Sequence, residues 1–180
     1  DVEGEARGPI VRDRLFYYVS GKRVGQDRKA LNHLPQVEGS HAPFQEERVE
    51  EKLFGKLTWT PGEAHRLEVS GAYTDTRADN YELTGFEAAG ATHRYTAPTF
   101  LLNGSFRELL GNWAVLEARL NHFDKDERFD PYRGREVPGL SNFSLTPPHN
   151  AFRNAPLTLR SAPSSTSATL LGTFRLRTGS

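Results

Sequence analysis

Leu53-Phe-Gly-Lys-Leu-Thr-Trp59 decides the fold class, because apolar and polar side chains alternate along most of its length. Successive side chains of a β-strand point to opposite faces, so Leu57 and Trp59 share one face and Lys56 lies on the other. Three further stretches repeat this pattern: Arg66-Leu-Glu-Val-Ser-Gly-Ala-Tyr73, Phe100-Leu-Leu-Asn-Gly-Ser-Phe-Arg107 and Ala114-Val-Leu-Glu-Ala-Arg-Leu-Asn121. The chain is therefore predicted to be all-β, with strands that have one apolar and one polar side.

Five long strands and a sixth candidate follow from this alternation. The predicted ranges are about 14–24, 49–60, 66–75, 99–108 and 113–123, with 168–177 as the sixth. Long polar connections follow the first, third and fifth strands. Short connections follow the second and fourth; in Thr60-Pro-Gly-Glu-Ala-His65, proline and glycine supply the dihedral angles of a tight turn. We expect an antiparallel up-and-down meander of five to six long strands.

The alternation of short and long connections favours part of a transmembrane β-barrel, where tight turns gather at one end and long loops at the other. Strands of about ten residues are long enough to cross a bilayer when tilted. Aromatic residues that we expect at the membrane interfaces are Trp59, Tyr73, Phe106 and Trp113. Polar residues that we expect to face the lumen are Lys56, Arg66, Glu68, Arg107, Glu117 and Arg119. A soluble β-sandwich has the same alternation and is the alternative fold.

The composition excludes several classes of function. The 180 residues include 23 basic and 23 acidic side chains, so no net charge attracts nucleic acid or an anionic membrane surface. The absence of cysteine excludes disulfides and thiolate chemistry. No apolar run has the length of a transmembrane helix, and the mean hydropathy of −0.63 is typical of a soluble protein. A barrel strand would also give such a value, since it exposes only every second residue to lipid.

No motif indicates catalysis, a cofactor or a metal. The six histidines have no zinc-site spacing, and neither a Gly-x-Ser-x-Gly motif nor a phosphate-binding glycine loop occurs. The acidic stretch 124–130 resembles a calcium loop but has Phe129 where such a loop needs glycine, so a solvated loop is the preferred interpretation. Glu68 and Glu117 would suit a glycosidase only if the sheet were a jelly roll. We expect them instead to pair with Lys56, Arg66 and Arg119 across neighbouring strands, and we expect no enzyme.

The N-terminal stretch Gly8-Pro-Ile-Val-Arg-Asp-Arg-Leu-Phe-Tyr-Tyr18 resembles TonB-dependent outer-membrane receptors, especially their Oar-like branch. In that family a similar run joins the periplasmic plug to the first barrel strand, although Arg7 stands here where the family has glycine. The run from Glu51 to Pro61, followed by His65-Arg-Leu-Glu-Val-Ser-Gly71, is similar to the family's second and third strands. The resemblance covers about residues 8–125.

This resemblance implies a plug-barrel junction over residues 1–13 and a partial β-barrel over 14–180. It also implies nutrient uptake across the outer membrane of a Gram-negative bacterium. The expected partners are outer-membrane lipid, a TonB-type energy-coupling protein that acts through a plug, and a small-molecule or oligosaccharide ligand of unknown identity. A segment with so few strands is expected to be inactive alone and to belong to a longer precursor with its targeting segment upstream. The alternative function is a soluble or surface-attached β-sandwich that binds carbohydrate through its long loops.

Overall fold

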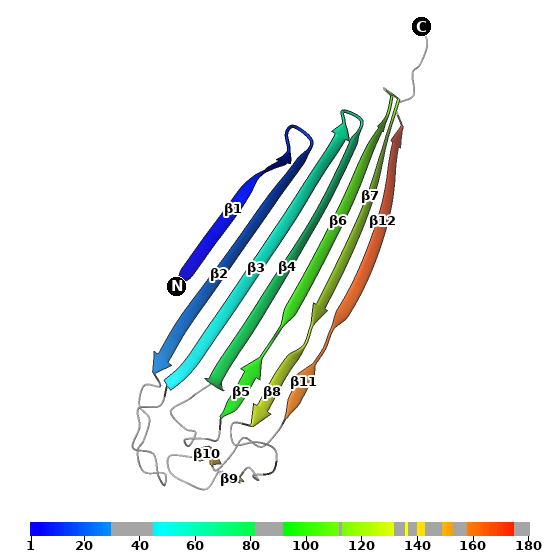
Figure 1. The fold of residues 1–180 in the computed structure, drawn as a ribbon. Helices are drawn as coiled ribbons and strands as arrows, with labels where there is room; N and C mark the ends of the chain where they lie inside the picture. Colours follow the sequence, from blue (N-terminus) through cyan, green and yellow to red (C-terminus); the bar gives the residue numbers. More distant parts are fainter. Residues whose placement is uncertain are drawn as a thin grey trace.

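The computed structural model describes residues 1–29, 45–81, 92–111, 113–131, 136, 140–142, 149–152 and 158–174. Ten strands form one antiparallel sheet (Figure 1), and two short strands pair separately. The strands of the large sheet are β1 (Val2–Val11), β2 (Leu15–Lys29), β3 (Gln45–Gly62), β4 (His65–Tyr81), β5 (His93–Thr96), β6 (Thr99–Leu110), β7 (Ala114–Lys125), β8 (Glu127–Pro131), β11 (Leu159–Ser161) and β12 (Ser164–Phe174). The separate pair is β9 (Leu140–Asn142) with β10 (His149–Phe152). No helix occurs in these ranges, and so none that could cross a membrane.

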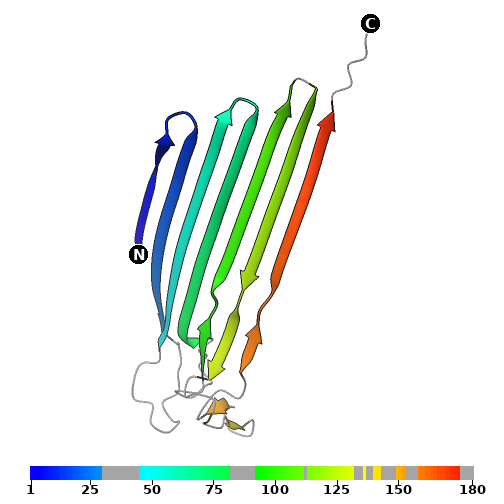
Figure 2. The ribbon, with the colours of Figure 1, turned by 45° about the vertical axis from the view of Figure 1, so that its right-hand side comes forward.

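The ten strands occupy seven positions across the sheet, because three positions hold two strands end to end. β1, β2, β3 and β4 follow one another, and β4 pairs with both β5 and β6. The next position holds β8 and β7, and the last holds β11 and β12. Figure 2 shows the strands running side by side, with β1 at one edge and β12 at the other. The sheet is open, since no pairing joins its two edges within the described ranges.

Three tight turns lie at one end of the sheet, which we call the turn end; the opposite end is the far end (Figure 1). Between β1 and β2 the Arg14 amide donates to the Val11 carbonyl at 3.1 Å, and Asp13 has a φ of 60°. Gly111, after β6, has a φ of 61°, the left-handed conformation that glycine adopts without strain. A short turn at Glu63-Ala64 joins β3 to β4; Pro61 and Gly62, which the sequence placed in the turn, belong to β3, and Gly62 does not have the positive φ predicted for it. The long connections join the strands at the far end, as the sequence predicts.

Three neighbouring positions are interrupted at the same level, and we call this line the crease. It runs through Ala97-Pro98, Asp126 and Ala162-Pro163, and it separates β5, β8 and β11 from β6, β7 and β12. Proline has no N–H to donate to a strand ladder, which explains two of the interruptions. The two proline carbonyls still accept hydrogen bonds, from the Asp126 amide to Pro98 and from the Lys125 amide to Pro163, both at 3.0 Å.

The sheet is a single layer, and its two faces differ in polarity. Directly opposed residues share a face, so the register places Leu57 beside Tyr17 and Val69. We call this side the apolar face; its members are Leu15, Tyr17, Val19, Leu53, Leu57, Trp59, Leu67, Val69, Tyr73, Phe100, Leu102, Phe106, Leu116, Ala118, Leu120, Ala168 and Leu170. Leu57 is 47% exposed and Val69 40%. No described segment forms a second layer over this face, as a sandwich would require.

The all-β, antiparallel, up-and-down architecture is confirmed, but the strands are longer and more numerous than predicted. At the far end, β2 continues five residues past its predicted limit at 24, and β4 continues six residues past 75. β3 begins four residues before its predicted start at 49. β1 was not predicted. The sixth candidate, 168–177, corresponds to β12, which begins four residues earlier. The solvated loop predicted for 124–130 is wrong: apart from Asp126 these residues belong to β7 and β8.

A small hydrophobic cluster packs on the other face at the far end. Ala78, Tyr95 and Ala97 are buried there, with Tyr81 and Phe129 packed against them. The Tyr95 ring stacks on the Tyr81 ring, with centroids 4.4 Å apart and planes inclined by 18°. The Phe129 ring lies 4.9 Å from that of Tyr95. This cluster joins β4, β5 and β8 beyond the crease.

Candidate functional site

The polar face carries the charged residues that the sequence singled out. Ser105 lies opposite Glu68 on one side and opposite Arg119 on the other, so these three residues share a face. Lys56 lies opposite Ser70 on the same face. The Lys56 ammonium lies 3.4 Å from the Glu68 carboxylate of the next strand. The predicted ion pair between neighbouring strands is confirmed for Lys56 and Glu68. It is wrong for Arg66 and Arg119, because Arg66 pairs with Glu68 within β4 and Arg119 with Glu117 within β7. Whether this face lines a lumen stays a prediction.

Both predicted carboxylates are surrounded by cations. The Arg66 guanidinium donates to Glu68 through Nε at 3.0 Å and Nη2 at 2.5 Å. Glu117 accepts from Arg119 at 3.1 Å and lies 3.8 Å from Nε of Arg107. Each carboxylate is thus neutralised by two basic groups. This arrangement suits a hydrated charged surface, since a glycosidase needs one of its two carboxyl groups to be a proton donor.

Aromatic residues mark both limits of the apolar face. Trp59 lies opposite Leu67, which lies opposite Phe106, in a row close to the turn end. Tyr73 lies opposite Phe100 in the row nearest the far end. Trp113 follows in the turn after β6 and is 55% exposed. The structure therefore brings Trp59, Phe106 and Trp113 to one limit and Tyr73 to the other.

Beyond the row of Tyr73 the same side of the sheet becomes charged within two residues. Leu53 is followed by Glu51 on this side, and Tyr73 by Asp75, because alternate residues of a strand share a face. Arg23 lies opposite Glu51. These residues line a groove of about 320 Å³. The sequence did not single them out as site residues, although Arg23, Glu51 and Asp75 lie inside the predicted strands 14–24, 49–60 and 66–75 and their alternation places them on this side.

The groove holds closely paired charges. The Arg77 guanidinium donates to the buried Asp75 carboxylate at 2.5 Å, and this contact raises the pKa of Arg77 above its usual value. The Arg23 guanidinium lies 3.6 Å from the Glu51 carboxylate. Farther along, the Arg94 guanidinium donates to Asp79 at 2.9 Å. All of these residues lie beyond the apolar face and on its side of the sheet.

A second ionic group lies on the crease. Asp126 accepts hydrogen bonds from Arg128 and, at 2.8 and 3.0 Å, from Arg160 of β11. The Arg128 contact, followed by the Arg160 contact, holds the pKa of Asp126 well below its usual range, and the same contact raises the pKa of Arg128. Asp126 is therefore engaged by two arginines. In the described ranges no group of three or more histidine, aspartate or glutamate side chains could hold a metal ion.

The polar side of the far-end cluster contains a partly buried hydrogen bond. The Tyr95 hydroxyl donates to the Glu127 carboxylate at 2.7 Å. Burial, and then this hydrogen bond, raise the pKa of Tyr95 well above its usual range. The hydrogen bond also lowers the pKa of Glu127, which lies 3.2 Å from the Lys125 ammonium. Tyrosine is thereby held neutral and glutamate ionised.

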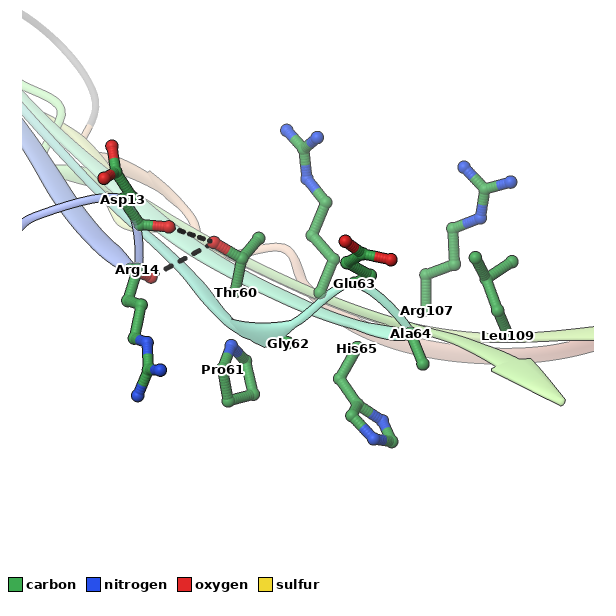
Figure 3. Close-up of a pocket in the computed structure, with 11 residues that line it drawn as sticks. Asp13, Arg14, Thr60, Pro61, Gly62, Glu63, Ala64, His65, Arg107 and Leu109 are labelled. Atoms are coloured by element: carbon green, nitrogen blue, oxygen red, sulfur yellow. Dashed lines mark hydrogen bonds between the residues drawn. The ribbon is translucent and has the colours of Figure 1, made fainter. Parts of the chain in front are cut away.

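A hollow of about 510 Å³ lies between the turns at the turn end (Figure 3). The Thr60 hydroxyl is within 3.5 Å of the Asp13 carbonyl and 3.3 Å of the Arg14 carbonyl, which ties the first two turns together. Figure 3 shows Glu63 and Arg107 pointing to one side of the sheet and His65 to the other. The side chains that line the hollow therefore extend from both faces of the sheet. They do not form a catalytic set.

Comparison with known proteins gives no family model, no curated protein and no solved structure that matches this chain. Function is therefore inferred from the residues and their geometry.

Proposed function

We propose that this chain is a segment of a transmembrane β-barrel in the outer membrane of a Gram-negative bacterium. The apolar face carries the proposal. It spreads over neighbouring strands, its large side chains are 40% or more exposed at Leu57, Val69 and Leu120, and no described segment covers it. In water a continuous apolar surface of this kind leads to aggregation, whereas hydrocarbon tails solvate it. The polar face would then line the lumen.

The dimensions of the sheet support a membrane span. From Glu51 to Pro61 the chain advances ten residues, roughly 33 Å along the strand. At a tilt of about 45° this rise becomes roughly 23 Å, close to the apolar band of about 25 Å in outer-membrane barrels. The aromatic rows lie just inside these limits, where interfacial aromatic residues are expected. Beyond Glu51 the strands continue to the far end, which would project into the external medium.

The open sheet also bears on activity. Seven strand positions are fewer than the eight that the smallest bacterial barrels use, and both edges of the described sheet carry unpaired backbone groups. Further strands are needed to complete a barrel of this kind. We therefore expect the isolated chain not to transport a solute by itself.

The specific proposal is a TonB-dependent receptor for nutrient uptake, supported by the resemblance at residues 8–18 and by the pairing of β3 with β4 through the short turn at Glu63-Ala64. In this proposal a TonB-type protein supplies energy through a plug outside this segment. The transported ligand is a small molecule or an oligosaccharide.

The membrane part of the proposal is tested with environment-sensitive probes. Because the chain has no cysteine, single cysteines at Val69 and Ser70 can be labelled without background. These neighbours lie on opposite faces, so a lipid-borne quencher should quench the probe at position 69 and a water-borne quencher the probe at 70. Equal quenching at both positions would contradict a lipid-facing apolar face. So would a chain that is monodisperse and melts cooperatively without detergent, which the sandwich alternative requires.

The receptor part has a separate test. A protein that contains this segment, expressed in a host lacking related receptors, should support uptake of a large solute, and uptake should stop when the proton gradient is dissipated. Uptake that persists without the gradient would favour a passive pore.

A further inference from the structure

The apolar face ends at different levels on different strands. On β3, β4 and β6 its far-end limit is one row of directly opposed residues, Leu53, Tyr73 and Phe100. On β7 and β12 the residues in that same row are Asp124 and Ser164. The far-end limit of the apolar face therefore does not follow a single row across the sheet.

The row one step closer to the turn end shows the same change. In this row Leu102 of β6 lies opposite His122 of β7, which lies opposite Thr166 of β12. The His122 Nδ1 atom lies 2.8 Å from the Thr166 hydroxyl oxygen. On β7 and β12 the last apolar residues toward the far end are Leu120 and Ala168, which lie directly opposite each other. The limit is thus displaced there by two rows, which is four residues.

The turn-end limit is displaced in the same direction. On β4 and β6 the apolar side is first interrupted by His65 and Glu108, whose side chains lie 3.7 Å apart. In the same row β7 has Leu116 and β12 has Gly172. One row farther, β7 continues with Ala114, so at this end it extends the apolar side by two rows. Because both limits move together, the apolar band on β7 and β12 is displaced and not shortened.

The displacement defines a slope across the sheet. β3, β4 and β6 occupy the third to fifth positions and β7 and β12 the sixth and seventh, so the middles of the two groups are two and a half positions apart. That separation is roughly 12 Å, and four residues are roughly 13 Å along a strand. The limits of the apolar band therefore cross the strands at roughly 45°. A flat bilayer can follow such limits only if the strands are inclined to it, and membrane barrels incline their strands by about 35 to 45°.

We propose that the bilayer crosses this sheet obliquely, so that hydrocarbon contacts β7 and β12 four residues closer to the turn end than it contacts β3, β4 and β6. His122 and Thr166 then lie outside the hydrocarbon, although Leu102 in the same row lies within it. Leu116 lies in hydrocarbon, although Glu108 directly opposite does not. This inference rests on the proposed membrane location and assigns the lipid-contacting residues of each strand.

The test compares labels that share a row but lie three strand positions apart. Single cysteines at Gly71 of β4 and Thr166 of β12 lie in one row, and cysteines at His65 and Gly172 lie in another. A Cβ atom at Gly71 meets only the Leu101 carbonyl oxygen, at 3.7 Å, so a cysteine fits there. At an inclination of 45° the two members of each pair differ in depth by roughly 10 Å. Fluorescent labels are read in the bilayer-inserted chain against quenchers placed at two depths in the lipid acyl chains.

The two pairs of labels should give opposite orders of depth. The deep quencher should act more strongly on the label at position 71 of β4 than on that at 166 of β12. In the other row it should act more strongly at position 172 of β12 than at 65 of β4. Equal depth within both pairs would overturn the oblique contact. A shallow position 166 without a deep position 172 would also overturn it, since His122 and Thr166 would then form only a local polar patch.

Charged substitutions in one row test the same inference by a second measurement. Leu102→Arg should reduce the yield of bilayer-inserted chain after refolding into vesicles, because it places a charge in hydrocarbon. Thr166→Arg, in the same row, should leave the yield close to that of the unchanged chain. Asn103→Arg, the neighbour of Leu102 on the polar face, is the matched control for β6. Equal losses in Leu102→Arg and Thr166→Arg would overturn the inference.

The labels also separate failure of this inference from failure of the proposed function. If lipid-borne quenchers act on the labels but without opposite orders in the two pairs, the oblique contact alone is overturned. If they act on none of the four labels, the membrane location is overturned, and the oblique contact with it.

Discussion

The Tyr95 hydroxyl on β5 donates to the Glu127 carboxylate on β8 at 2.7 Å, while the Tyr95 ring stacks on that of Tyr81. Tyr95→Phe keeps the stacked ring and removes the hydrogen bond. We expect a loss of about 1 kcal/mol in the free energy of unfolding, since a partly buried hydrogen bond disappears. Denaturant titration of the folded chain in detergent measures this loss. Tyr18→Phe, whose hydroxyl bonds to Glu5 on the exposed surface, is the matched control and should change little.

The same pair predicts instability in alkali. The pKa of Tyr95 is raised in the folded chain, so below pH 10 the residue is neutral in both states and its contribution is fully present. Above pH 10 the unfolded chain loses the proton first. The free energy of unfolding should then fall by up to about 1.4 kcal/mol for each pH unit that this residue controls. In Tyr95→Phe this part of the alkaline slope should vanish; an unchanged slope would contradict the assignment.

Asp126 should control the stability of the far end in acid. Its pKa is lowered by Arg128 and Arg160, so its contribution is present above about pH 4 and is lost as the pH falls further. Asp126→Asn should remove that acid dependence and should speed amide hydrogen exchange in β8 and β11 at neutral pH. Asp124→Asn, two residues earlier on β7, is the control. Equal exchange in both variants would mean that the arginine contacts do not hold β11.

A charge on the apolar face should disturb membrane insertion in a way that depends on the face. Val69→Arg places a guanidinium in the middle of the apolar face, where a charge in the bilayer midplane costs about 2 to 4 kcal/mol. Ser70→Arg adds the same side chain to the polar face and should have a much smaller effect. The yield of folded, bilayer-inserted chain after refolding into vesicles measures the difference. Two equally impaired variants would place both faces in similar surroundings.

Disulfide trapping tests the register of the last strand. Asn121 on β7 lies opposite Ser167 on β12, and their side chains are hydrogen-bonded at 3.4 Å. Directly opposed residues of an antiparallel pair have Cα atoms about 4.5 to 5.5 Å apart, within disulfide range. The double variant Asn121→Cys/Ser167→Cys should therefore cross-link on oxidation and shift in electrophoretic mobility. Asn121→Cys/Ser165→Cys, offset by two residues, should cross-link much less; the reverse result would mean that the strand has slipped.

Alternation predicted the central part of the sheet well, because most side chains there match the polarity of their face, although one row, Phe54, Ala72, Leu101 and Phe123, places apolar residues on the polar face. Leu57, Val69 and Leu120 are exposed on the apolar face, and Lys56 and Glu68 pair on the other. The face on which each of these side chains lies follows from its position in the alternating sequence. A tight turn after Trp59 is present as well, but it lies at Glu63-Ala64, because Pro61 and Gly62 continue β3.

The far end could not be predicted in the same way. From Glu51 outward both faces are charged or mixed, so the period of two no longer separates apolar from polar residues, although β3 continues to Gln45. In β8 the charged residues Arg128 and Asp130 flank Phe129, and no apolar alternation marks a strand. The segment forms a strand because it pairs with β5 and β11. β1 is held mainly by β2. The pairings of β8 join residues distant in sequence, which composition does not reveal, whereas β1 and β2 are consecutive strands joined by a tight turn.

The crease has a mechanical consequence. Across Pro98 and Pro163 two N–H donors are missing, so bending the sheet there breaks fewer hydrogen bonds than bending it elsewhere. β2, β3 and β4 cross the same level without interruption. If the far end bends outward, we therefore expect β5, β8 and β11 to move about the crease, while β2, β3 and β4 stay straight.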